Sequence, residues 1–310
     1  MDPDTFHLVQ RTAQPGTHDS EVARKRLAAR TLPKALHNLA ESAKSFRLNR
    51  PLETAMNMAL AVGAPLLLTG EPGTGKTQVA WYLGWYFGIP VFAYQVRSSS
   101  TAADMKYDFD AVAYLRNAQH PDEPILARHE FLRKKALWQA YECTTDAVLL
   151  IDEIDKAPRD FPNDLLLELD QHQFQHPFLD DVIAPQSGKP PIVIITSNVE
   201  RRLPDAFLRR CIFYHIELTE QLVRDAVQAR AGDFPHLDAA TRDEALRRFW
   251  ELRDNDQIQK PPSTAEALVW LAILSAQGVT ADQLRAVDLA ELPGLNALIK
   301  DHGDLDRLNR

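Results

Sequence analysis

The segment with the clearest chemical pattern is residues 70–77, which read Gly-Glu-Pro-Gly-Thr-Gly-Lys-Thr. This spacing matches the phosphate-binding P-loop, G-x-x-x-x-G-K-[ST]. Glycines let successive backbone N–H groups turn inward around a phosphate, and the following helix directs its positive end at the same anion. The pattern predicts that Lys76 binds the β- and γ-phosphates of a nucleotide and that the Thr77 hydroxyl binds Mg²⁺. The residues expected to hold the nucleotide are Glu71, Pro72, Gly73, Thr74, Gly75, Lys76, Thr77 and Gln78.

Two adjacent carboxylates, Asp152 and Glu153, follow the apolar residues 148–151. A buried strand that ends here would deliver Asp152 to the Mg²⁺. Glu153 would then face the γ-phosphate, where it can orient or deprotonate the attacking water. The other interpretation is a buried strand that meets a solvated acidic loop. The P-loop upstream favours the first interpretation.

A third polar strand end follows the apolar residues 191–196, which lead into Ser197 and Asn198. An amide at this tip can hydrogen-bond the attacking water and the γ-phosphate. The sequence therefore predicts that Asn198 senses the γ-phosphate. The alternative is an asparagine that only caps the strand end.

Arg209 and Arg210 end a short predicted helix just before another strand. The planar fork of arginine suits a phosphate that gathers charge in the transition state. We expect one of the two to act in trans, on the nucleotide of a neighbouring subunit. Arg210 is the better candidate because it lies one residue nearer the strand. The alternative is a solvated pair that interacts favourably with the negative end of the helix dipole.

Five strand candidates would position these side chains, and helical or mixed segments separate them. They are residues 65–69, 90–96, 147–151, 191–196 and 212–218. Most are continuous apolar runs, which are typical of strands buried on both faces of a parallel sheet. Residues 212–218 are mixed and are expected at an edge or an interface. A helix over residues 78–87, with Gly88 as its C-cap, follows the P-loop.

The strand signals stop at residue 218. Together with the helical pattern before residue 47, this end divides the chain into three predicted regions. Residues 1–46 are expected to form a helical lead that is partly flexible, and residues 47–218 an α/β core. Residues 219–310 are expected to form a small all-helical domain, because capping boxes begin at Thr241, Ser263 and Thr280. The charged tail, residues 301–310, is expected to fray.

Composition limits the remaining function classes. The net charge of -8 argues against a dedicated nucleic-acid binder, although a local basic patch stays open. The two cysteines, Cys143 and Cys211, have neither metal-ligand spacing nor a disulfide pattern and fit a reducing cytoplasm. Residues 1–11 lack the apolar centre of a signal peptide. No apolar run approaches the roughly 18 residues that a membrane span needs.

The order of these motifs, over residues 46–276, resembles the AAA+ ATPases. Residues 66–77, 150–157 and 203–210 are most similar to the MoxR-like branch. The resemblance implies an α/β P-loop core with a five-stranded parallel sheet, followed by a helical lid. It also implies ATP and Mg²⁺ as cofactors, ATP hydrolysis that remodels or activates a partner protein, and a hexameric ring. MoxR-like ATPases often act with partners that contain a von Willebrand factor A domain, which makes such a protein a candidate partner.

Three segments depart from the family pattern. The segment that matches the lid helix start, residues 260–266, has no sensor-2 arginine, so that role is missing or passes to Lys260. Residues 97–126 are expected to be a helix-2 insertion or a pore-facing element. Residues 171–190, with Phe174 and Phe178, are expected to be the hairpin that precedes the Asn198 strand. Packed aromatic loops are the alternative for both.

Three other functions fit parts of the pattern. A nucleotide-gated switch or scaffold, for example in a bacterial conflict system, would hydrolyse ATP slowly, and Glu153 and Asn198 favour hydrolysis over it. A small-molecule kinase usually carries its lid inside the α/β core, which the helical C-terminal region argues against. A nucleic-acid-associated motor is disfavoured by the acidic net charge.

Overall fold

The computed structural model describes residues 20–29, 38–119, 126–198 and 202–309. It separates into two compact units. One is Leu48–Glu217, and the other combines Leu218–Arg310 with the N-terminal residues up to Arg47. The expectation of disorder over residues 1–19 lies outside the described residues, as do residues 30–37 of the predicted helical lead.

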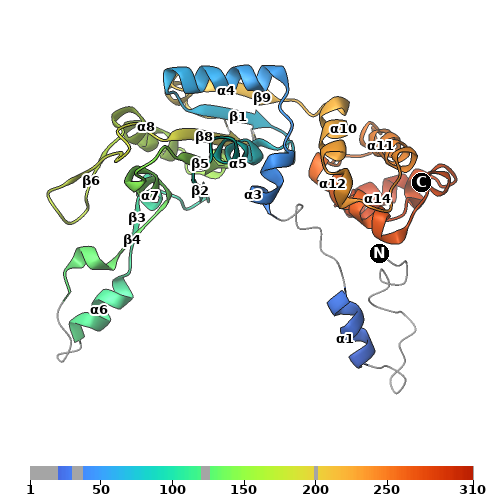
Figure 1. Cartoon of the computed structure of the whole chain (residues 1–310), viewed down its shortest axis with the longest axis horizontal. Coiled ribbons are helices and arrows are strands. Elements are labelled where there is room, and N and C mark those ends of the chain that lie inside the picture. The colour runs from blue at the N-terminus through green and yellow to red at the C-terminus, as the bar shows by residue number, and fades with distance from the viewer. Residues whose placement is uncertain (1–19, 30–37, 120–125, 199–201, 310) are drawn as a thin grey trace. The chain divides into compact units, whose positions relative to one another are not determined.

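A five-stranded parallel sheet in the order β2-β5-β8-β1-β9 is the centre of Leu48–Glu217 (Figure 1). Its strands are β1 (Leu66–Gly70), β2 (Val91–Gln95), β5 (Val148–Asp152), β8 (Ile192–Ser197) and β9 (Ile212–Ile216). The predicted five-stranded parallel sheet is therefore confirmed. The inner strands β1, β5 and β8 are almost wholly buried, which explains their continuous apolar sequences. The partly exposed strands β2 and β9 form the edges, as their more mixed side chains require.

The helices of this unit are α4 (Arg50–Val62), α5 (Lys76–Phe87), α6 (Ala111–Gln119), α7 (Ala136–Glu142), α8 (Phe161–Gln171) and α9 (Asp205–Leu208). Helix α5 contacts β1, β2, β5 and β8, and therefore packs across the sheet directly after the P-loop. Gly88 caps α5 in the left-handed conformation with φ 65°, as predicted.

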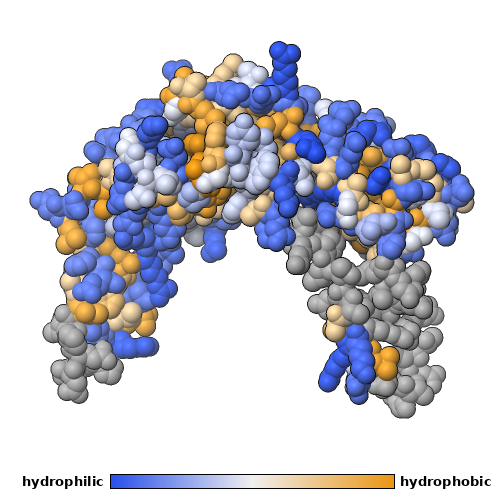
Figure 2. Space-filling model, viewed as in Figure 1, coloured by the Kyte–Doolittle hydropathy of each residue, from blue (hydrophilic) through white to orange (hydrophobic). Residues whose placement is uncertain are grey.

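Two elements extend from this unit away from the sheet (Figure 1). The first is an insertion between β2 and β5. In it, β3 (Tyr107–Phe109) pairs antiparallel with β4 (Leu132–Lys134), and α6 lies in the chain segment that connects the two strands. The second is the predicted hairpin before β8, formed by β6 (Phe174–Gln175) and β7 (Val182–Ile183). The rings of Phe109 and Phe178, 5.3 Å apart, join the two elements. Hydrophobic side chains are exposed along the insertion (Figure 2), including Val112 and Leu115.

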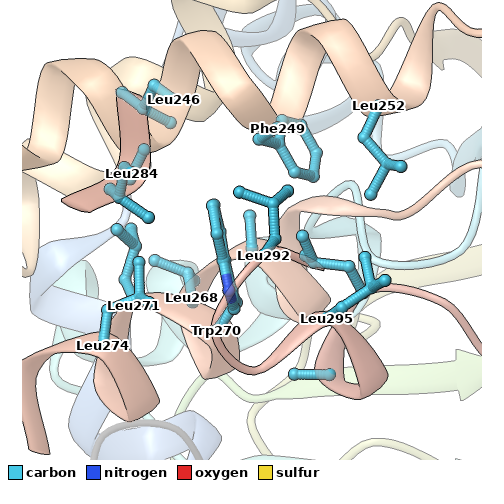
Figure 3. Packing of buried hydrophobic residues seen from close by; sticks show 14 of the residues in the cluster. Leu246, Phe249, Leu252, Leu268, Trp270, Leu271, Leu274, Leu284, Leu292 and Leu295 are labelled. Atoms are coloured by element: carbon cyan, nitrogen blue, oxygen red, sulfur yellow. The ribbon is translucent and has the colours of Figure 1, made fainter. Parts of the chain in front are cut away.

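The second unit is helical. Its helices are α1 (Ser20–Ala29), α3 (Leu39–Ser42), α10 (Glu220–Ala229), α11 (Ala239–Arg253), α12 (Thr264–Gln277), α13 (Ala281–Arg285) and α14 (His302–Leu308). Leu246 and Phe249 of α11 pack with Trp270 and Leu271 of α12 in a buried core (Figure 3). The capping boxes predicted at Ser263 and Thr280 are confirmed.

Two predictions for this unit are wrong. Helix α11 begins before Thr241, because Asp238 is its N-cap and accepts the Thr241 backbone N–H at 2.7 Å. Residues 301–310 were expected to fray, but residues 302–308 form helix α14. The reason is Asp304, a fully buried carboxylate that accepts the backbone N–H groups of Gln259 and Lys260, each at 3.0 Å. In the described part of the chain, every helix is too short or too polar to cross a bilayer.

Candidate active site

The carboxyl ends of the parallel strands bring the predicted site residues to one edge of the sheet. The P-loop follows β1, Asp152 and Glu153 end β5, and Asn198 follows β8. Because β8 lies between β5 and β1, these segments are direct neighbours although far apart in sequence.

The P-loop backbone adopts conformations that require glycine. Gly70, Gly73 and Gly75 have φ angles of 147°, 78° and 91°. A Cβ on Gly70 would lie 2.5 Å from the Ile216 carbonyl oxygen of β9, so the close approach of β9 also excludes a side chain. Helix α5 starts at Lys76, directly after the loop. The positive end of its dipole and its first N–H groups therefore lie where the motif needs an anion.

Lys76 is buried beneath the loop, with 5% of its surface exposed. Its Nζ donates to the carbonyl oxygens of Gly70 at 2.9 Å and Glu71 at 2.7 Å. Burial lowers the pKa of the Lys76 amine, and the carboxylates of Asp152 and Asp155 oppose this shift. A buried ammonium costs free energy unless anions or acceptors compensate it. Lys76 is thus held beneath the P-loop by two carbonyl acceptors, at the position from which the motif predicts a contact with a phosphate.

Thr77 and Asp152 are in direct contact. The Thr77 hydroxyl donates to Asp152 Oδ1 at 2.8 Å, and the Thr196 hydroxyl of β8 donates to the same oxygen at 2.6 Å. A hydroxyl and a carboxylate are hard oxygen ligands of the kind that Mg²⁺ prefers. The described residues contain no cluster of three or more His, Cys, Asp or Glu side chains that could hold a metal by themselves. The donor set therefore fits Mg²⁺ that takes its remaining ligands from phosphates and water.

Glu153 has an unusual backbone, with φ 60° and ψ 51°. This left-handed conformation is uncommon for a residue with a side chain. Its N–H donates to the Thr196 hydroxyl at 2.8 Å, which holds the turn. One carboxylate oxygen accepts the Gln95 amide and the Lys156 ammonium, each at 2.5 Å. The other accepts the Asn198 amide at 3.2 Å.

Asn198 is fixed from both sides. Its side-chain amide binds Glu153, and its backbone N–H donates at 3.1 Å to Asp155, a carboxylate with 2% exposure. The structure thus brings together Lys76, Thr77, Asp152, Glu153 and Asn198 at one edge of the sheet.

The paired arginines lie apart from this cluster. Both are exposed and follow α9. The Arg210 Nε donates to both carboxylate oxygens of Asp170 at 3.0 and 2.9 Å, and its Nη1 donates to the Ala206 carbonyl at 2.9 Å. Across the described residues, neither arginine forms a hydrogen bond with the P-loop or with Glu153. The Arg209 side chain has no hydrogen-bond partner there.

Sequence reasoning missed Thr196, Gln95, Lys156 and Asp170. Gln95 is the polar end of β2 and lies in register with Asp152, so it could be found once β2 is known to pair with β5. Thr196 lies two residues before Asn198, but its contacts with Asp152 and Glu153 depend on how β5 and β8 align. Lys156 pairs with Glu153, three residues before it, so the sequence spacing could have indicated this contact. Asp170 carries no local signal, because Arg210 is 40 residues away in sequence.

Comparison with known proteins agrees with this geometry. Residues 65–211 match the family model of the AAA domain, dynein-related subfamily. This segment, just under half of the chain, is therefore similar to an AAA domain. The similarity supports ATP binding and ATPase activity. The matched segment contains the P-loop, the Asp-Glu pair, Asn198 and both arginines.

Among solved structures, the chain is similar to the crystal structure of a candidate ATPase from Cytophaga hutchinsonii. The two share 13% sequence identity, the match covers 82% of this chain and 84% of that one, and the TM-score is 0.39. No curated protein matches the chain.

Proposed function

We propose that the chain is a MoxR-like AAA+ ATPase that uses ATP hydrolysis to remodel or activate a partner protein. The observation that carries the hydrolytic part is the contact between Glu153 and Asn198, 3.2 Å apart, beside the Thr77–Asp152 pair. This arrangement supports a site in which a base, an amide and a metal-binding pair would surround one phosphate.

We assign the following roles, which the geometry supports. Lys76 and the P-loop N–H groups bind the β- and γ-phosphates, and Thr77 and Asp152 hold Mg²⁺. When bound, Mg²⁺ neutralises charge on the phosphate oxygens. Glu153 takes a proton from the attacking water or orients it, and Asn198 holds that water and the γ-phosphate in line.

The arginines supply the remaining positive charge in trans. Because neither hydrogen-bonds to the P-loop of its own chain within the described ranges, an arginine from a neighbouring subunit would complete the site. This role requires assembly, and we propose a homo-oligomer in the form of a hexameric ring. An arginine supplied in this way can raise the rate roughly 10³-fold or more.

The regional roles extend the proposal along the chain. Residues 47–218 would be the ATPase core, residues 219–310 the lid, and residues 1–46 a helical lead. The role of the missing sensor-2 arginine would fall to Lys260, whose ammonium pairs with Asp301 at 3.0 Å. We further propose a cytoplasmic location and a partner with a von Willebrand factor A domain.

A nucleotide-gated switch is the second candidate function. It is supported by the Glu153 carboxylate, which Gln95 and Lys156 both bind at 2.5 Å. A base held by these donors has fewer lone pairs for water, which favours slow hydrolysis. The dependence of turnover on protein concentration separates the two. The remodelling ATPase gains activity as subunits assemble, whereas a switch stays slow until its partner binds.

The substitution Glu153→Gln tests the hydrolytic mechanism. It keeps the size of the side chain but removes the carboxylate, so the variant should bind Mg·ATP and fail to hydrolyse it.

A further inference from the structure

We propose that Asp170 is a positioning residue that orients the Arg210 guanidinium toward the nucleotide of a neighbouring subunit. The inference rests on the proposed function, in which an arginine acts in trans. It goes beyond that function by assigning the role to Arg210 rather than Arg209, and by naming the group that aims it.

The contacts of Arg210 fix one edge of its guanidinium. A guanidinium has five N–H donors in one plane. Nε donates to both oxygens of Asp170, and Nη1 donates to the Ala206 carbonyl. These bonds come from two different nitrogens, so they define the orientation of the whole plane. In the described part of the chain Nη2 has no partner, and 43% of the side chain is exposed. The guanidinium therefore presents its opposite edge to the outside.

Asp170 can hold this orientation because helix α8 is anchored. Leu165 and Leu169 of α8 are buried in the hydrophobic core. Glu168, which has 7% exposure, pairs with Lys106 at 2.6 Å, and its backbone carbonyl accepts the Tyr141 hydroxyl at 3.3 Å. The carboxylate that binds Arg210 thus lies on a packed helix, two residues from a partly buried ion pair.

Arg209 offers a contrast. It is exposed, and no hydrogen bond holds its side chain among the described residues. A long side chain without a partner loses more conformational freedom when it binds a phosphate than one that is already oriented. Preorganised charge also stabilises a transition state better than charge that must reorient. Both arguments favour Arg210 as the residue that acts in trans.

Stability alone does not account for the Asp170–Arg210 pair, because exposed ion pairs contribute little to folding. Asp170 has 46% exposure. We therefore expect Asp170→Ala to fold normally, as thermal unfolding will show. The nearly isosteric Asp170→Asn is a second variant that removes the charge but keeps one acceptor.

The first measurement is steady-state ATPase activity of the assembled protein. Asp170→Ala should lower kcat roughly 10-fold or more, because small misplacement of a catalytic group is costly, and ATP affinity should stay unchanged. Asp170→Asn should lie between this variant and the wild type. Asp164→Ala, an exposed aspartate of the same helix, is the matched control and should keep full activity. The double variant with Asp170→Ala and Arg210→Ala should have the same kcat as Arg210→Ala alone.

The decisive measurement mixes subunits. Asp170→Ala subunits keep an intact nucleotide site but have a misdirected Arg210. Glu153→Gln subunits keep a correctly oriented Arg210 but cannot hydrolyse the ATP in their own site. Mixed assemblies, verified by co-purification of two tags, should recover activity. Mixtures of Asp170→Ala with Arg210→Ala should not recover, since both lack an aimed arginine.

Two results would overturn the inference. One is normal turnover by Asp170→Ala. The other is no recovery with Glu153→Gln in verified mixed assemblies, which would mean that Asp170 acts within its own subunit. Failure of the proposed function is distinguishable, because Arg209→Ala and Arg210→Ala would then both hydrolyse ATP at the wild-type rate.

Discussion

The Thr196 hydroxyl joins the Asp152 carboxylate to the Glu153 backbone, and its removal gives the sharpest structural prediction. It donates to Asp152 Oδ1 at 2.6 Å and accepts the Glu153 N–H at 2.8 Å. Thr196 itself is 1% exposed. Thr196→Val has the same shape and loses both bonds at once. The substitution leaves the Glu153 N–H without an acceptor, and the left-handed turn at Glu153 loses the hydrogen bond that holds it.

The magnitude follows from these two bonds. A hydrogen bond to a charged group contributes about 1.5–3 kcal/mol, and an unsatisfied buried N–H costs about 1–3 kcal/mol. Because both bonds are only part-buried, we expect Thr196→Val to lower the free energy of unfolding by about 2–4 kcal/mol. Turnover should fall roughly 10- to 100-fold, the range for losing a group that orients a metal ligand.

Urea unfolding and steady-state ATPase assays measure the two effects. Thr196→Ser is the matched control, since it keeps the hydroxyl and loses only a buried methyl group worth about 1 kcal/mol. It should retain most of the activity. If Thr196→Val matches Thr196→Ser in both assays, the hydroxyl does not organise the site and the reasoning is refuted.

Two further predictions concern single side chains. Lys156→Met should raise kcat about 2- to 5-fold, because it releases a carboxylate from a partly exposed ion pair worth about 0.5–1 kcal/mol. Lys135→Met is the control, since the Lys135 side chain is equally exposed, at 42%, and pairs with Asp108 away from the site. Lower turnover by Lys156→Met would show instead that Lys156 orients the Glu153 carboxylate. Burial raises the pKa of the Cys211 thiol to about 12, so at pH 8 only about 10⁻⁴ of it is thiolate. Cys211 is partly buried, so iodoacetamide followed by mass spectrometry should modify it far more slowly in the native than in the unfolded chain, and rapid labelling of the native chain would contradict the raised pKa.

Local patterns were enough to predict the elements that carry the site. The P-loop, the Asp152-Glu153 strand end and the Asn198 strand end each depend on a few consecutive residues, and the parallel sheet follows from their apolar runs. The order β2-β5-β8-β1-β9 is not local, because it depends on how the strands pack. That order decides that Thr196 reaches the Asp152 carboxylate and the Glu153 N–H, and that Gln95 reaches the Glu153 carboxylate.

The difference between local sequence patterns and tertiary contacts also explains the two wrong predictions in the helical unit. Thr241 fits a capping box, but Asp238 competes for the same helix start and forms the cap. Residues 301–310 look like a solvated tail because they are highly charged. Nothing in that segment alone reveals that Asp304 finds two backbone donors more than 40 residues away. Tertiary partners, rather than local preference, decide both cases.

The most direct test of the account compares ATP binding and ATP hydrolysis in one variant, Glu153→Gln. Calorimetry of Mg·ATP binding and a phosphate-release assay would be run on the same preparation of assembled protein, with the wild type beside it. The affinity of Glu153→Gln for Mg·ATP should be close to that of the wild type, and its turnover should be lower by roughly 10²-fold or more, because only the general base is lost. Wild-type turnover by Glu153→Gln would contradict the account, since the base would then lie elsewhere.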